Sequence, residues 1–105
     1  MTDHTILLIQ KNNNPNSRTY SEHRVVSEAL EHIIALFEQR LKTLHPHSEH
    51  INYHIDELNM FIDNHHELVA LTLDNSVKAY VPRDRAWLKV KINEHLTKQA
   101  RAGKN

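Results

Sequence analysis

The sequence predicts an α+β fold with the element order ββααββα and one antiparallel sheet. Short apolar segments with β-branched residues occur in two pairs, and turn-forming residues join the members of each pair. Three longer stretches instead repeat their apolar residues at helical spacing. With 105 residues, of which 39% are hydrophobic, the chain has the size and composition of one globular domain, and we expect residues 1–105 to form it.

The most apolar run of the chain, residues 4–10 (HTILLIQ), predicts a strand that is buried on both faces. Successive side chains of a strand point to opposite faces, so Ile6 and Leu8 point one way and Leu7 and Ile9 the other. The helices of the same chain can cover one of these faces. We expect a second copy of the chain to cover the other.

An asparagine-rich loop at residues 11–17 and a short strand at 18–20 complete the first hairpin. Thr19 and Ser21, with Glu22 shortly after them, fit a capping box. This motif predicts that one long helix without glycine or proline runs from Glu22 to about Leu44. Its apolar residues form a stripe that is broader than a simple amphipathic face, as in a helix that packs against more than one partner.

Similar patterns predict the rest of the chain. Asp56 and Glu57 suit the first turn of a second helix, because the N-terminus of a helix carries partial positive charge. The remaining elements are a polar connection at 45–54, a helix at 55–66, a strand at 68–73, a turn at 74–76, a strand at 78–81 that Pro82 ends, a helix at 85–101 that Asp84 caps, and a flexible tail at 102–105.

The composition excludes several classes of protein. Thirteen basic residues balance 13 acidic ones, so the chain lacks the basic bias of a dedicated nucleic-acid binder. Without cysteine, neither a disulfide nor a thiolate zinc site can form. The single glycine, Gly103, excludes Gly-rich phosphate loops. The apolar N-terminal run is too short for a signal peptide or a membrane span, and we expect an intracellular protein.

Ten histidines are an unusually high number for a chain of this length. His50 and His54 have a spacing that zinc ligands can use on a helix, but Pro46 and Asn52 disfavour a helix there. A solvent-exposed segment that gains positive charge at about pH 6 is the simpler interpretation, and we expect no metal site. Six of the histidines lie in this part of the chain: His45, His47, His50, His54, His65 and His66.

No set of residues predicts catalysis. The carboxylate pairs Asp56/Glu57 and Asp63/Glu67 fall where solvated helix faces are expected. No nucleophile stands in a recognisable motif. We therefore predict that the protein is not an enzyme and needs no cofactor.

The C-terminal third of the chain is mildly basic, which leaves direct RNA binding by the last helix as an alternative. Solvated helix charges are the simpler interpretation, because these cations form no RNA-binding signature with aromatic residues. The basic residues are Arg83, Arg85, Lys89, Lys91, Lys98, Arg101 and Lys104.

Four short motifs stand along the chain: HTILL at 4–8, RTY at 18–20, FID at 61–63, and YVP at 80–82 with Trp87-Leu88 after it. Together they resemble the enhancer of rudimentary homologue family, over essentially the whole chain and in the same element order. The histidine-rich connection departs from the family pattern, as does Leu73, where a tyrosine is usual. The chain therefore resembles a divergent member.

The resemblance implies a four-stranded antiparallel sheet with three helices on one face. It also implies a homodimer in which two sheets face each other in a pseudo-β-barrel. Such a two-fold interface would extend the core of a small domain. The residues that we expect at this dimer interface are Ile6, Leu8, Gln10, Tyr20 and Tyr80.

The resemblance further implies a function without catalysis. Family members are adaptors that bind short segments of RNA-processing proteins, in small-RNA biogenesis and in mRNA processing and elimination, and have an older link to pyrimidine metabolism and the cell cycle. We expect the chain to bind a second copy of itself and short peptide segments, with RNA bound indirectly. No membrane or small-molecule substrate is expected, and the site of action would be the nucleus or the cytoplasm.

Two further expectations concern single residues. We expect the long helix to form part of a partner groove with Leu30, Ile34 and Phe37. Thr19 precedes Glu22 by three residues, as in acidophilic kinase sites, and the family is reported to be phosphorylated in this region. A phosphate on Thr19 would act on the predicted helix cap.

Overall fold

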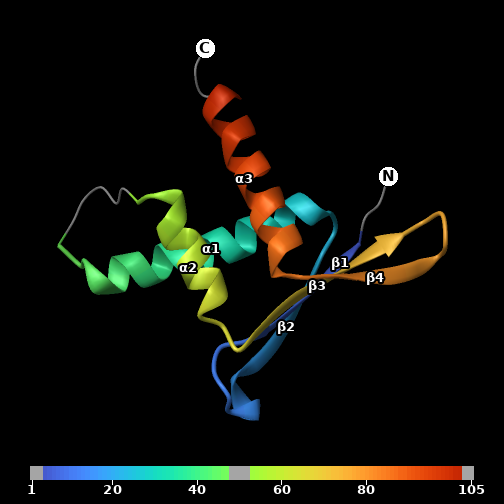
Figure 1. The fold of residues 1–105 in the computed structure, drawn as a ribbon, viewed down its shortest axis with the longest axis horizontal. Helices are drawn as coiled ribbons and strands as arrows, with labels where there is room; N and C mark the ends of the chain where they lie inside the picture. Colours follow the sequence, from blue (N-terminus) through green and yellow to red (C-terminus); the bar gives the residue numbers. More distant parts are fainter. Residues whose placement is uncertain (1–3, 48–52, 103–105) are drawn as a thin grey trace.

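The computed structural model describes residues 4–47 and 53–102 and confirms the predicted order ββααββα (Figure 1). A single 3-10 turn, Pro15–Ser17, lies in the first hairpin loop. The strands are β1 (Thr5–Gln10), β2 (Arg18–His23), β3 (Glu67–Asp74) and β4 (Ala79–Arg83). The helices are α1 (Val26–Leu44), α2 (Ile55–Asp63) and α3 (Arg85–Ala102).

The four strands form one antiparallel sheet in the order β2-β1-β3-β4. The apolar strand β1 therefore lies in the interior of the sheet, and β2 and β4 are its edges. Figure 1 shows the three helices on one side of this sheet. The fold class expected from the sequence is therefore confirmed for the single chain.

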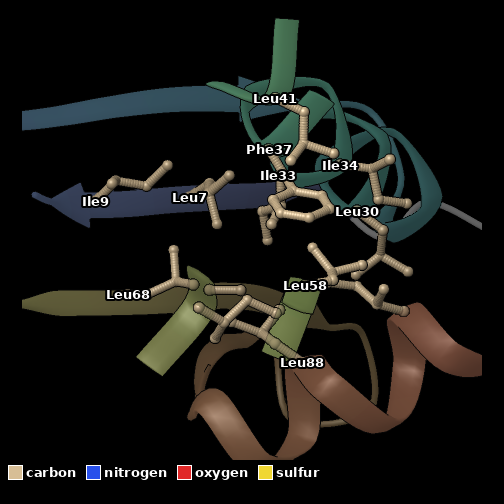
Figure 2. Close-up of a cluster of buried hydrophobic side chains, with 13 residues drawn as sticks. Leu7, Ile9, Leu30, Ile33, Ile34, Phe37, Leu41, Leu58, Leu68 and Leu88 are labelled. Carbon is tan, nitrogen blue, oxygen red and sulfur yellow. The ribbon is translucent and has the colours of Figure 1, made fainter. Parts of the chain in front are cut away.

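The core lies between the sheet and the helices. Leu7 of β1 is fully buried, and its neighbour Leu8 is 40% exposed, so β1 has the predicted alternation of faces. Figure 2 shows the side chains of Leu7, Leu58 and Leu88 among the buried residues that β1, α2 and α3 contribute. Removing these side chains from water is the main favourable term for the fold.

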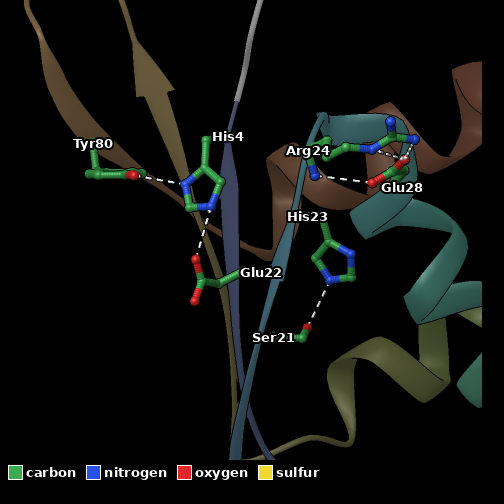
Figure 3. Close-up of polar contacts among 7 residues, drawn as sticks. All are labelled: His4, Ser21, Glu22, His23, Arg24, Glu28 and Tyr80. Carbon is green, nitrogen blue, oxygen red and sulfur yellow. Dashed lines mark hydrogen bonds and ion pairs between the residues drawn. The ribbon is translucent and has the colours of Figure 1, made fainter.

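The predicted start of the long helix is wrong, because residues 18–23 all pair with β1. Their backbone groups bond to a neighbouring strand, so the capping box predicted at residues 19–22 does not form. The helix begins at Val26 instead, and its N-cap residue Val25 has no side-chain hydrogen bond. The carboxylate of Glu28 accepts from the backbone N–H of Arg24 and pairs with the Arg24 guanidinium at 2.7 Å (Figure 3).

Other boundaries differ by a few residues. Helix α2 ends at Asp63 and not at His66, and its N-cap is His54, whose Nδ1 accepts from the N–H of Asp56 at 3.2 Å. Pro82 lies within β4 and does not end it, because an edge strand tolerates a residue without an N–H donor. Asp84 caps α3 as predicted, since its carboxylate accepts from the N–H of Trp87 at 3.0 Å.

Two expectations fall wholly or partly outside the described residues. The predicted tail at 102–105 is described only at Ala102, which is the last residue of α3. His50 of the candidate zinc pair also lies outside them. Among the residues that are described, no helix has the length and apolar character needed to span a bilayer.

Candidate functional site

The sheet surface that faces away from the helices carries many apolar side chains beside a few polar and charged ones, and no helix of the chain covers it. We call this surface the outer face. Tyr20 is 66% exposed on it and Tyr80 is 42% exposed. The strand register places the following residues there: Ile6, Leu8, Tyr20, Val69, Leu71, Leu73, Tyr80 and Pro82. Exposed apolar patches are typical of surfaces that bind other molecules, so the outer face is a candidate interaction surface.

Four of the five residues predicted at a dimer interface have side chains with solvent-accessible area on the outer face. They are Ile6, which is half-buried, and the exposed Leu8, Tyr20 and Tyr80. Gln10 lies on the same face but is only 3% exposed, because its side chain accepts from Nε of Arg18 and donates to the backbone O of Asn12. Little of Gln10 remains for contact with a second subunit.

A polar network crosses the outer face from one edge strand to the other. The Nε2 atom of His4 lies 3.1 Å from a carboxylate oxygen of Glu22 in β2, and Nδ1 lies 2.7 Å from the hydroxyl oxygen of Tyr80 in β4 (Figure 3). A carboxylate only accepts, so Nε2 donates to Glu22, whereas a hydroxyl group such as that of Tyr80 can either donate to Nδ1 or accept from it. Sequence reasoning missed this network, because its members are far apart in the chain and carry no local signal.

A second candidate surface is a hollow of about 390 Å³ between α1 and α2. We call it the α1–α2 groove. Two exposed apolar residues, Leu44 (58%) and Met60 (63%), stand on its lining. The apolar lining consists of Phe37, Leu41, Leu44, Met60 and Phe61, and the cations Lys11 and Arg40 lie beside it. This arrangement can hold bulky apolar side chains.

The α1–α2 groove lies further along α1 than the predicted groove residues. Of these, Leu30 and Ile34 belong to the buried core cluster and have almost no solvent-accessible area. Phe37 also belongs to that cluster, but it lines the α1–α2 groove as well. The exposed position Leu44 at the end of α1 was not selected from the sequence, although it continues the apolar stripe of the helix.

His65 is one of the residues that line the α1–α2 groove. Its Nδ1 donates to the backbone O of Phe61 at 2.9 Å, and its ring meets the Phe61 ring edge-on, with 4.7 Å between the ring centroids. Burial lowers the pKa of His65, and the nearby charges of Arg85, Lys11 and Arg40 lower it further, against the opposing effect of the Phe61 hydrogen bond. His65 is therefore neutral at pH 7 and serves as a packed ring.

A second hollow, of about 620 Å³, adjoins the α1–α2 groove, and both are lined by Lys11, Arg40, Phe61 and His65. The candidate phosphorylation site Thr19 is exposed and lies on the lining of this second hollow. Because Thr19 is in β2 and not at the start of a helix, a phosphate there would not act on a helix cap. It would instead add negative charge to a hollow that Lys11 and Arg40 line.

The histidines and carboxylates considered above as metal ligands or catalytic groups form no common site in the part of the chain that the structure describes. Within the described residues, no group of three or more His, Cys, Asp or Glu side chains is placed to hold a metal ion. His54 caps α2. Asp63 forms an ion pair with Lys89 of α3 at 2.6 Å, which joins α2 to α3.

Two of the basic residues near α3, Arg83 and Lys91, lie close to the ring of Trp87. The guanidinium carbon of Arg83 lies 5.0 Å from the centroid of Trp87, and Nζ of Lys91 lies 5.7 Å from it. These are cation–π distances. The pattern of charges in the sequence did not single out this cluster, because Arg83 is in β4 and Lys91 is in α3.

The fold and these surfaces define a small α+β protein with an uncovered sheet face and an apolar groove between two helices. The chain belongs to the enhancer of rudimentary family, whose pattern matches residues 1–102. The resemblance inferred from the four short motifs is therefore confirmed.

Curated relatives support the assignment over most of the chain. An enhancer of rudimentary homolog from Arabidopsis thaliana is 38% identical over 101 residues, which cover 96% of this chain and 93% of the relative. One from Dictyostelium discoideum is 39% identical, with 92% and 97% covered. Enhancer of rudimentary homolog 1 from Schizosaccharomyces pombe is 31% identical, with 90% and 86% covered. These names refer to the family and not to an enzymatic activity.

Proposed function

We propose that this protein is a non-enzymatic homodimeric adaptor that binds short segments of RNA-processing proteins in the nucleus or the cytoplasm. The uncovered outer face of the sheet is the observation on which the proposal rests. Membership of the enhancer of rudimentary family supports it, because adaptor function is what the resemblance implied. The partner proteins and the RNA pathway would follow from the segments that bind.

The outer face fits a second copy of the same chain for two reasons. A small domain with Leu8, Tyr20 and Tyr80 in water leaves apolar area unburied that a symmetric contact would remove from solvent. The contact would also bury the His4 network, whose groups already satisfy one another within the chain. Burying satisfied polar groups costs much less than burying unpaired ones.

Light scattering on the purified protein tests the dimer. The wild-type protein is expected to have the mass of two chains. The variant that combines Ile6→Arg with Leu8→Arg is expected to have the mass of one chain or to be unfolded. The control Val90→Arg places one arginine on an exposed position of α3 and should leave the dimer intact. A folded dimer in the double arginine variant would contradict the assignment of the outer face.

Affinity purification of the tagged chain tests the adaptor function. Wild type and the Val90→Arg control should recover the same RNA-processing proteins, and the double arginine variant should lose them. If a folded, monomeric variant recovers them equally well, each subunit binds its partner alone and the bridging role is wrong. If wild type recovers none, adaptor function is wrong.

Direct RNA binding is the second candidate function, and the cluster of Arg83, Trp87 and Lys91 favours it. An aromatic ring flanked by cations can stack on an unpaired base. Purified protein that binds single-stranded RNA with a steep salt dependence, and that loses binding in Trp87→Ala, would support this function. Binding that is unchanged in Trp87→Ala would contradict it.

A further inference from the structure

We propose that the α1–α2 groove binds an amphipathic partner segment that carries acidic side chains beside its apolar ones. This inference rests on the proposed adaptor function and adds where the segment binds and what its chemistry is. The apolar lining, the two cations beside it and the shared boundary with the second hollow carry the argument.

The apolar part of the groove has a buried floor and an exposed rim. Phe37 is buried, and its ring centroid lies 5.3 Å from that of Phe61, so the floor is fixed by ring packing. Leu44 and Met60 stand at the rim from two different helices and are mostly in water. A methionine adapts to different side-chain shapes, which suits a rim that closes on an inserted residue. An apolar anchor residue in such a hollow is how short segments gain most of their affinity.

The charge around the groove is mainly positive. Within the described residues, Lys11 and Arg40 form no ion pair, and their side chains donate no hydrogen bond. The guanidinium of Arg85 donates to the backbone O atoms of Asp63 and His66 and not to a carboxylate. Its positive charge also lowers the pKa of His65. Glu57 is the acidic residue on the groove lining, at the first turn of α2. The cations are therefore available to carboxylates of a partner.

Lys11 and Arg40 also line the second hollow. They thus stand where two hollows of about 390 Å³ and 620 Å³ meet. A segment with apolar residues in the α1–α2 groove would pass these cations on its way to the second hollow. Acidic side chains next to the apolar ones would then pair with Lys11 and Arg40, and basic ones would be repelled.

A displayed library of random linear peptides, selected on the intact wild-type protein, is the probe for this proposal. The selected peptides should combine bulky apolar residues with Asp or Glu. Arg40→Glu should weaken their binding by about tenfold or more, as expected when a charge pair becomes a repulsion. Lys42→Glu is the matched control, because it reverses a charge on an exposed position of α1 that points away from Arg40. It should leave the affinity unchanged.

Two further variants separate this site from other binding sites. Met60→Ser removes a rim side chain without disturbing a buried residue, and it should weaken binding, whereas Val90→Ser on α3 should not. Peptides whose Asp and Glu residues are changed to Lys should no longer bind the wild-type protein, and they should bind the Arg40→Glu variant more tightly than the wild-type protein. Enrichment of basic or purely apolar peptides, or equal binding to Arg40→Glu and wild type, would overturn the proposal.

The same selection distinguishes failure of this proposal from failure of adaptor function. If the selected peptides bind with unchanged affinity to Met60→Ser and Arg40→Glu, segments bind elsewhere, so the adaptor function stands and the groove is wrong. If no peptide is selected and affinity purification also recovers no partner, both proposals are wrong.

Discussion

His4 and Tyr80 are 76 residues apart in the sequence, yet Nδ1 of His4 lies 2.7 Å from the Tyr80 hydroxyl oxygen, and the two rings meet edge-on. The same imidazole contacts Glu22 with its other nitrogen. His4 thus links both edge strands across the outer face of the sheet. A second subunit on this face would cover the network and strengthen its hydrogen bonds by excluding water.

Tyr80→Phe tests whether the network lies in the dimer interface. The change removes the hydroxyl group and leaves Nδ1 of His4 without its partner, which costs about 1–3 kcal/mol if the site is buried by a second subunit. Sedimentation equilibrium should then give a dimer dissociation constant that is higher by about tenfold or more.

Tyr20→Phe is the control for this prediction. Tyr20 lies on the same face, but its hydroxyl group has no hydrogen bond within the described residues. Removal of that hydroxyl should change the dissociation constant little. Equal effects of the two changes would place the His4 network in solvent and contradict its burial by a second subunit.

Leu88→Ala tests how much α3 contributes to the core. Leu88 is fully buried in the cluster that joins the sheet to the helices, so truncation removes apolar contacts and leaves a cavity. The free energy of unfolding should fall by about 2–5 kcal/mol in urea denaturation at a fixed protein concentration. Val90→Ala on the exposed side of the same helix should change it by less than about 0.5 kcal/mol. Similar losses for both variants would contradict the packing of α3.

The sequence predicted those parts of the fold that depend on local periodicity. The alternation of Leu7 and Leu8 set the two faces of β1, and Asp84 marked the start of α3. The start of α1 was mispredicted because Ser21 and Glu22 carry a helix-capping pattern but pair with Leu7 and Ile6. Local capping propensity is weak compared with a complete ladder of strand hydrogen bonds.

The candidate sites depend on contacts between distant parts of the chain, which a single sequence does not contain. The apolar character of Met60 and Leu44 is visible in the sequence, but their meeting across a groove follows from the packing of α2 against α1. The position of Arg40 beside Lys11 follows in the same way. Periodicity therefore marks the apolar stripe of α1 but not which of its residues stay exposed beside α2.

Thr19→Glu tests the effect of negative charge in the second hollow. Thr19 shares that hollow with Lys11 and Arg40, so a carboxylate there would compete with the acidic side chains of a bound segment. Peptides selected on wild type should bind the variant about three- to tenfold more weakly in a titration at low salt.

Thr43→Glu is not a suitable control, because Thr43 also lines this hollow. Thr97→Glu on α3 is suitable and should bind like wild type. Tighter binding to Thr19→Glu would contradict the predicted partner charge.

The pH dependence of stability should identify His65 as a buried neutral ring. Burial lowers the pKa of His65 in the folded chain below its ordinary value of 6.5. As the pH falls below about 6.5, the unfolded chain takes up a proton before the folded chain does. The free energy of unfolding therefore decreases as the pH falls, and the contribution of His65 is complete above that pH.

His65→Asn keeps a donor for the backbone O of Phe61 but cannot titrate. Urea denaturation between about pH 7 and 5 should show a weaker loss of stability for this variant than for wild type, with the lowered pKa of His23 accounting for part of what remains. The control His66→Asn changes an exposed neighbour and should lose stability with falling pH as the wild type does. If His65→Asn also loses stability as the wild type does, protonation of His65 does not oppose folding.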